Sequence, residues 1–232
     1  MENPGHFSAE INTRGLPEDQ TRGICEIGWT DVHDNWTIHG PYSALVNPGH
    51  PIPPVTRAVH HISDADVAGA ITADAACAML MSGMAHGDVF AAHNAKFERA
   101  FFGGGQHEWI CTLQCARHLF PDAPGHSNQV LRYHLDIDGE GDFDGAAAMP
   151  PHRAGPDTLV TAFVLRRLIF ASSVNELVRL TSAPVVLQTI TFGKHRGMKW
   201  ADLPRDYLQW IAFKSELGVD EKHTARHILG DV

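Results

Sequence analysis

The segment Asn47–Pro54 (Asn-Pro-Gly-His-Pro-Ile-Pro-Pro) restricts the fold more than any other part of this 232-residue chain. Its prolines have no backbone N–H, so the segment forms neither a helix interior nor a central strand. Before it, strand-like patterns at residues 6–12, 24–32 and 36–46 predict an antiparallel meander. After it, helical periodicity alternates with short apolar runs. This order predicts an α/β protein with a mixed sheet flanked by helices on both faces.

The part after the prolines is read as an alternation of helices and short buried strands. Ser63 is the expected N-cap of the first helix. The expected strands are 88–92 and 109–112, and the expected helices are 75–84, 96–102, 113–120, 157–172 and 173–180. Thr181–Pro184 is the expected linker, which divides the chain into a main domain, residues 1–180, and a small C-terminal module, residues 185–232.

Composition narrows the classes of function. No apolar run is long enough to span a bilayer, and the first residues lack the pattern of a secretory signal, so we expect a cytoplasmic protein without a membrane partner. The net charge of −9 argues against a broad, nonspecific nucleic-acid binder. It leaves open an enzyme that holds one chain end through metal ions, because bound cations reverse the local sign. The scattered cysteines, Cys25, Cys77, Cys111 and Cys115, are expected to be reduced, buried thiols.

Three short motifs occur in one order along the chain. They are Glu10–Leu16 (Glu-Ile-Asn-Thr-Arg-Gly-Leu), Ala92–Glu98 (Ala-His-Asn-Ala-Lys-Phe-Glu), and His152 followed five residues later by Asp157. This set resembles the DEDDh 3′→5′ exonuclease superfamily, and the likeness covers roughly residues 6–172. The stretch Thr191–Gly197 resembles the C-terminal element of its exonuclease X-like members. The resemblance implies a ribonuclease H-like fold and hydrolysis of nucleic acid from the 3′ end, with single-stranded DNA favoured.

The resemblance also implies the site residues. Glu10, Asn12, Glu98 and Asp157 would surround two Mg²⁺ or Mn²⁺ ions, and His152 would be the general base. Oxygen ligands suit hard divalent ions, and a histidine titrates near neutrality. The positions implied to contact substrate are Thr13, Gly15, Leu16, His61, Asn94 and Phe97. His93 is expected to hold a turn, and His60 and His61 to order a loop.

The first two motifs depart from the family pattern, which has Asp at position 10, Glu at position 12 and Asp at position 98. Asn12 offers a neutral oxygen, so at most three carboxylates remain. A shifted register would place Ser8 and Glu10 at the acidic positions instead. Two functions therefore stand open: an active metal-dependent exonuclease, and an impaired exonuclease fold that binds nucleic acid or nucleotides without cutting them.

Two further segments have competing interpretations. The acidic stretch Asp136–Asp144 faintly resembles a calcium loop, but Ala147 occupies the position of the bidentate glutamate, which favours a solvated acidic loop that repels phosphate. In the C-terminal module a local basic excess lies between Gln188 and Lys214. The aromatic side chains there either stack bases or form a small core: Phe192, Trp200, Tyr207 and Trp210.

Overall fold

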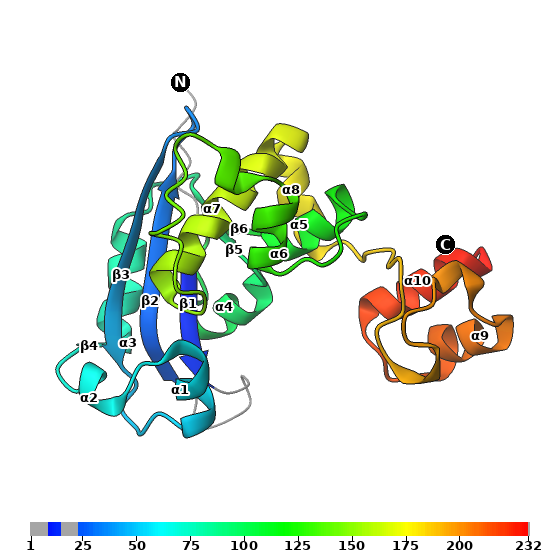
Figure 1. The fold of residues 1–232 in the computed structure, drawn as a ribbon, viewed down its shortest axis with the longest axis horizontal. Coiled ribbons are helices and arrows are strands. Elements are labelled where there is room, and N and C mark those ends of the chain that lie inside the picture. Colours follow the sequence, from blue (N-terminus) through cyan, green and yellow to red (C-terminus); the bar gives the residue numbers. More distant parts are fainter. Residues whose placement is uncertain (1–8, 15–22, 232) are drawn as a thin grey trace.

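A computed structural model of the chain describes residues 23–231 with their side chains. For residues 9–14 it describes the backbone alone. Its larger sheet is the expected meander, in which β1 (Ala9–Arg14), β2 (Gly23–Val32) and β3 (Ile38–Asn47) are antiparallel neighbours. The short β4 (Ile71–Thr72) joins β3 in parallel. A second, parallel pair consists of β5 (Val89–Ala92) and β6 (Glu108–Cys111), and β5 packs beside β1 (Figure 1).

The expected helices are present with small shifts of their ends, and two helices that were not predicted, Pro54–His60 and Asn128–His134, occur among them. In the main part of the chain they are α1 (Pro54–His60), α2 (Asp64–Val67), α3 (Ala73–Ser82), α4 (Ala95–Phe102), α5 (Thr112–Leu119), α6 (Asn128–His134), α7 (Ala154–Ala171) and α8 (Val174–Ser182). The C-terminal segment holds α9 (Arg205–Lys214) and α10 (Val219–Leu229), and short 3-10 turns occur at Ile137–Gly139, Gly193–His195 and Trp200–Asp202. The expected cap at Ser63 is confirmed. Its side chain accepts the Asp66 N–H, and the Asp66 carboxylate accepts the Ser63 N–H.

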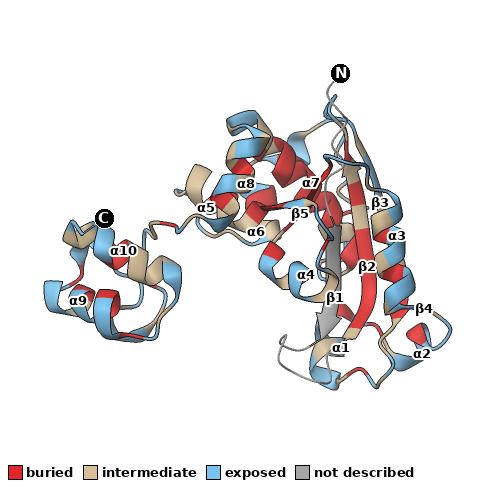
Figure 2. Cartoon of the chain, turned by 180° about the vertical axis from the view of Figure 1, so that it is seen from behind, coloured by how far each residue is buried: buried red, intermediate tan, exposed pale blue. Residues whose placement is uncertain are grey.

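Both faces of the meander are covered, which explains why β2 is apolar along most of its length. Helix α7 packs on one face of β2 and β3, and α3 packs on the other (Figures 1 and 2). Ile27 belongs to the core shared with α3, whereas Val32 belongs to the core built on Phe163 and Leu165 of α7. The sheet therefore lies between two apolar layers, as the strand and helix pattern predicted.

The first turn of α7 lies unusually close to the sheet. A Cβ atom on Gly28 would stand 2.4 Å from the backbone carbon of Ala154, so only glycine fits at this crossing. One turn farther on, the hydroxyls of Thr30 and Thr158 lie 2.8 Å apart and form a buried hydrogen bond. This close approach fixes where the residues that precede and begin α7 stand relative to β2.

The C-terminal segment, residues 185–231, has an apolar core of its own. Ile190, Trp200, Leu208 and Ile211 are buried against one another, and residues of α10 complete the cluster. In Figure 1 this segment lies to one side of the sheet and follows a thin connecting stretch after α8. A self-contained core agrees with the proposed domain division, which stays a prediction.

The cysteines are free thiols, as expected. Cys25, Cys111 and Cys115 are buried, whereas Cys77 keeps partial exposure. Burial raises the pKa of Cys25 to about 11 and that of Cys115 to about 12, which makes both thiols poor nucleophiles. Among the described residues, no helix combines the length and apolar character that crossing a bilayer requires.

Candidate active site

The residues that precede α7 bring His152 and Asp157 together. His152 has a left-handed backbone, with φ of 65°, and its backbone N–H donates to Oδ2 of Asp157 at 3.0 Å. This bond closes the five-residue spacing of the motif into one turn, and the His152 residue remains exposed to solvent. A left-handed conformation is uncommon for a non-glycine residue and here turns the chain sharply into the helix.

The carboxyl group of Asp157 lies in an environment that disfavours its charge. Burial raises the pKa of Asp157 to about 6, and the nearby carboxylate of Glu26 adds to the increase. The charge of His152 and the bond from its backbone N–H act in the opposite direction. A carboxylate with a raised pKa gains most from a bound cation, because the cation replaces the solvation that burial removed.

A buried carboxylate on β2, Glu26, anchors the first turn of α7. Its side chain is 2% exposed and accepts hydrogen bonds from Arg153 Nε at 3.1 Å, Arg153 Nη2 at 2.7 Å and the Ala154 N–H at 2.8 Å. These bonds also raise the pKa of Arg153. Charge-assisted bonds to both carboxylate oxygens offset the cost of burying Glu26. They fix the backbone between His152 and Asp157.

Sequence reasoning did not find Glu26. The signal was present, since Glu26 is an acidic residue flanked by the apolar Cys25 and Ile27 in a predicted strand. A charged residue at such a position needs a partner, but its partner Arg153 lies 127 residues away. The pairing therefore appears only in the folded chain.

A second contact steadies the same helix from α6. The Asn128 side-chain N–H₂ donates to Thr161 Oγ1 at 2.9 Å and approaches the Asp157 carbonyl oxygen at 3.5 Å. Ser127, the N-cap of α6, holds the start of that helix by accepting the Val130 N–H. Ser127 and Asn128 thus link α6 to the helix that carries Asp157.

The backbone of β1 places the first motif beside this turn. Position 12 pairs with Glu26, and position 10 pairs with Gly28, the glycine at the crossing with α7. The register shifts between Asn12 and Thr13. Gly15 and Leu16 lie outside the described residues, as does Ser8 of the alternative register, and the side chains of Glu10, Asn12 and Thr13 are likewise outside the described part.

The second motif runs from the end of β5 into α4. Glu98 is buried in the first turn of α4, with 5% exposure. Asn94 adopts a left-handed backbone, with φ of 84°, at the N-cap position and is exposed, and the Phe97 ring packs 5.2 Å from that of Phe101. Both views place α4 beside β1 (Figures 1 and 2). The motif carboxylate positions therefore belong to β1, α4 and α7; α7 packs against β1, and α4 packs against β5, the strand beside β1.

The donors in this region are carboxylate oxygens, which suit a hard divalent cation. Within residues 23–231, no group of three histidine, cysteine, aspartate or glutamate side chains stands close enough to hold a metal ion by itself. Asp157 and Glu98 come from that range, whereas positions 10 and 12 belong to β1. The predicted meeting of Glu10, Glu98 and Asp157 in one cluster stays a prediction.

The other histidines of the motifs have structural contacts. His93 Nε2 lies 2.7 Å from the His126 carbonyl oxygen, and Nδ1 lies 3.0 Å from the Thr112 hydroxyl. Burial lowers the pKa of His93 to about 4, which keeps the ring neutral. These bonds confirm that His93 holds a turn.

The neighbouring pair His60 and His61 orders a loop, as predicted. Buried His60 accepts the Ile62 N–H at Nδ1, at 3.0 Å, and burial lowers its pKa. His61 is exposed and left-handed, with φ of 60°, and ends α1 by donating its backbone N–H to Arg57 O. The implied contact of His61 with substrate stays a prediction.

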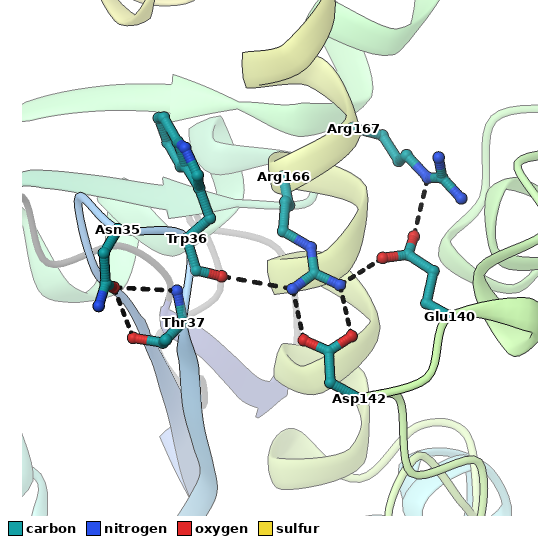
Figure 3. Close-up of polar contacts among 7 residues, drawn as sticks. All are labelled: Asn35, Trp36, Thr37, Glu140, Asp142, Arg166 and Arg167. Atoms are coloured by element: carbon teal, nitrogen blue, oxygen red, sulfur yellow. Dashed lines mark hydrogen bonds and ion pairs between the residues drawn. The ribbon is translucent and has the colours of Figure 1, made fainter.

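The Asp136–Asp144 loop is exposed at Asp138 and Asp142, as the solvated interpretation predicted, but three of its carboxylates are paired with arginines, which reduces the free charge expected to repel phosphate. Buried Arg166 binds Asp142 through two bonds, at 2.6 and 2.8 Å, and also pairs with Glu140 (Figure 3). Arg167 pairs with Glu140 at 2.8 Å, and Arg132 pairs with Asp138 at 2.6 Å. The bonds from Arg166 lower the pKa of Asp142.

Arg166 also donates to the Trp36 carbonyl oxygen at 3.3 Å, so this arginine ties the loop to the turn between β2 and β3 (Figure 3). Neutralised carboxylates repel phosphate far less than free ones. The loop is therefore a structural brace at the far end of α7.

A cleft of about 560 Å³ adjoins the second motif. Asn94, Lys96 and Arg99 line one part of it, and Arg117 and Asp220, 3.5 Å apart, line another. The lining has three basic side chains against two acidic ones, Asp220 and Glu221, so the positive charge is concentrated at Lys96 and Arg99, beside Asn94.

Comparison with known proteins agrees with this geometry. The sequence profile of the RNase T family, described as Exonuclease, matches residues 12–165. Exodeoxyribonuclease 10 of Escherichia coli strain K12 is 32% identical over 215 residues, which cover 87% of this chain and 91% of that protein. A DNA polymerase III subunit epsilon-like protein of Rhodobacter capsulatus is also 32% identical, over 69% of this chain and 23% of its own length.

Solved structures show the same fold. Exonuclease X in complex with 5′ overhanging duplex DNA superposes with a TM-score of 0.64 and 29% identity, covering 76% of this chain and 99% of that chain. The nuclease domain of 3′hExo, a DEDDh family member bound to rAMP, gives a TM-score of 0.55 at 13% identity, covering 72% of this chain and 92% of that one. The predicted ribonuclease H-like mixed sheet is therefore confirmed.

Proposed function

Because the chain belongs to the RNase T family of exonucleases, we propose that it removes nucleotides from the 3′ end of DNA and releases nucleoside 5′-monophosphates. The nuclease class follows from the family. The direction of degradation, the preference for DNA and the preference for single strands are our proposal, supported by the motif order and by likeness to an exodeoxyribonuclease.

One observation carries the proposal above all others. Exposed His152 and partly buried Asp157 are joined by a backbone hydrogen bond, and Glu26 braces the turn between them. A general base needs access to substrate and a fixed position, and this turn supplies both. A raised pKa at Asp157, in a site built of oxygen donors, fits a cation-binding carboxylate.

DEDDh exonucleases generally use divalent metal ions. In this chain we assign the ligand positions to Glu10, Asn12, Glu98 and Asp157, with Mg²⁺ or Mn²⁺ as the cation in a two-metal site. When bound, such ions activate water and stabilise the oxygen that leaves. Asn12 supplies an amide oxygen in place of a carboxylate, so we expect weaker metal binding than four acidic ligands give.

The protein's own residues have distinct tasks in this proposal. The His152 ring takes the proton from the attacking water, and the bond to Asp157 Oδ2 fixes its backbone. Glu26 and Arg153 prevent the turn from shifting. Thr13, Gly15, Leu16, His61, Asn94 and Phe97 are proposed to contact the terminal nucleotides. Lys96 and Arg99 of the adjoining cleft add positive charge near Asn94.

The direct test compares the two ends of one oligonucleotide. A single-stranded DNA labelled at its 3′ end, and the same DNA labelled at its 5′ end, are incubated with the protein and Mg²⁺, Mn²⁺ or EDTA. We expect early release of labelled mononucleotide from the 3′-labelled DNA and gradual shortening of the 5′-labelled DNA, with neither in EDTA. Release of the 5′ label first, internal cuts, or equal activity in EDTA would contradict the proposal. A matched RNA oligonucleotide tests the preference for DNA.

A further inference from the structure

Helix α9 of the C-terminal segment has one buried face and one open aromatic face. Leu208, Ile211 and Ala212 are buried in the core of the segment. Trp210 is 44% exposed and Phe213 is 58% exposed, although both are large apolar side chains. Five side chains of this open face surround a hollow of about 390 Å³: Asp206, Gln209, Trp210, Phe213 and Lys214.

Rings and cations alternate along this surface. Tyr207 and Trp210 are stacked, with ring centroids 5.6 Å apart and planes inclined by 21°. Lys194 Nζ lies 5.6 Å from the Tyr207 ring centre, and Arg226 lies 5.7 Å from that of Phe213. Each contact holds a ring beside a positive charge, an arrangement that suits a ligand with flat rings and negative charges.

The charge of the segment differs from that of the rest of the chain. Residues 185–232 contain seven lysines and arginines against six aspartates and glutamates, whereas the whole chain has a net charge of −9. The segment thus has a slight positive balance, whereas residues 1–184 hold 11 lysines and arginines against 21 aspartates and glutamates. Trp200 is 1% exposed and belongs to its core, so the aromatic side chains divide between core and surface roles.

We propose that this open face of α9 is a second binding site, for single-stranded nucleic acid, separate from the catalytic turn. Bases would stack on Trp210 and Phe213 at the hollow, and the phosphates would lie near Lys194, Lys214 and Arg226. Stacking accepts any base, so the site binds without sequence preference. It would hold the strand while its 3′ end is at the active site, but binding there requires neither metal nor hydrolysis.

The observations favour nucleic acid over a protein partner. Exposed aromatic rings serve both protein interfaces and base stacking, so the choice of nucleic acid rests on the cations beside the rings. This face presents two rings across a hollow, with a third ring stacked behind Trp210 and cations beside two of the rings. Asp206 is the acidic member of the hollow, and it would leave the edge nearest to it less attractive to phosphate.

The test measures binding of a fluorescent 30-nucleotide oligo(dT) to the full-length protein in EDTA, which excludes metal-dependent cleavage. We expect Trp210→Ala and Phe213→Ala each to weaken binding by about 5- to 100-fold, the range for losing one stacked base. Trp210→Phe should retain most of the affinity, because a ring remains. Lys214→Gln should lower the slope of log K against log salt by roughly one.

The matched control is Phe170→Ala, which removes another exposed ring, 61% exposed, from the end of α7. Its affinity should match that of the unchanged protein. Equal binding by Trp210→Ala, Phe213→Ala and the unchanged protein would overturn the proposal, provided that their melting temperatures agree. Unchanged oligo(dT) binding together with a change in oligomeric state on gel filtration would overturn it in favour of a protein interface. Loss of hydrolysis alone, with binding in EDTA intact, would contradict the proposed function and leave this site standing.

Discussion

The two ends of helix α7 are both held by arginine–carboxylate pairs, yet they differ in what surrounds those pairs. At the start, Arg153 pairs with Glu26, and the exposed His152 and a second carboxylate, Asp157, adjoin this pair. At the far end, Arg166 and Arg167 pair with Glu140 and Asp142 of the Asp136–Asp144 loop. Within residues 23–231, no lysine or arginine forms an ion pair with Asp157, whose pKa is raised, whereas the pKa of Asp142 is lowered.

This difference separates a candidate site from a structural brace. A carboxylate whose charge is satisfied by arginine has little to offer a cation, so an acidic cluster alone does not indicate a metal site. A carboxylate that burial has made costly to ionise gains from a cation. The residues at the N-terminal end of α7 are therefore the proposed catalytic ones, whereas those at its C-terminal end stabilise the fold.

The largest effect is expected on stability, from removing Arg166, which braces the acidic loop at the far end of α7. Arg166→Met should lower the free energy of unfolding by roughly 3 kcal/mol, because Glu140 loses a partner in a partly buried place. The nuclease rate of the folded fraction should not change. Urea unfolding measures the loss, with Arg179→Met as control, since the exposed pair of Arg179 with Glu176 should contribute less than about 1 kcal/mol. Equal losses in both variants would remove the distinction between brace and surface pair.

The next effect concerns the catalytic end. His152→Ala should lower the rate of hydrolysis by roughly 100-fold at neutral pH, the scale for losing a general base. Metal affinity, measured by calorimetry, should stay nearly the same. His86→Ala, at another exposed histidine, should keep the full rate. A rate within twofold of normal for His152→Ala would exclude the proposed base.

The third prediction uses the half-buried histidine of the second motif, His93. The pKa of His93 is lowered to about 4 in the folded protein, so the unfolded chain takes up the proton at higher pH. Stability from this group is complete above pH 6.5 and is lost as pH falls toward 4. Between pH 7 and 5 the loss should be about 2 kcal/mol. In His93→Gln, which cannot titrate, this acid-dependent loss should shrink, and an undiminished loss would assign it to other groups.

The smallest effect tests whether Glu26 positions the catalytic turn. Glu26→Gln replaces one acceptor oxygen with a donor beside Arg153 and Ala154, so kcat should fall roughly 10-fold while KM stays constant. Thr30→Val is the control, because it removes another buried bond between β2 and α7 without touching that turn. An equal loss of kcat in both variants would show that packing of α7, and not the turn, sets the rate.

Many of the helices and strands can be predicted from the sequence, because local residue patterns determine them. The strand expected at residues 24–32 is observed at Gly23–Val32, and the helix expected at 157–172 is observed at Ala154–Ala171. The helix starts earlier because the left-handed His152 and the cap position Arg153 stand before it. The histidine and carboxylate of the third motif are identified by their five-residue spacing together with the resemblance carried by the two upstream motifs.

The long-range pairs could not be predicted. Glu26 meets Arg153 from 127 residues away, and the acidic loop meets Arg166 across 24 to 26 residues. Nothing in the local pattern of Asp136–Asp144 indicates which arginine will face it. For that reason the sequence predicts the exposure of the loop but not its arginine pairs, and it does not indicate a role for Glu26.

The most direct test of the account makes the same carboxylate-to-amide change at both ends of α7. Hydrolysis of a 3′-labelled oligonucleotide is measured against Mn²⁺ concentration for Asp157→Asn and Asp142→Asn. We predict that Asp157→Asn has no measurable hydrolysis at any Mn²⁺ concentration, whereas Asp142→Asn keeps the rate and the metal dependence of the unchanged protein. Full activity in Asp157→Asn, or loss of activity confined to Asp142→Asn, would contradict the assignment of the catalytic end.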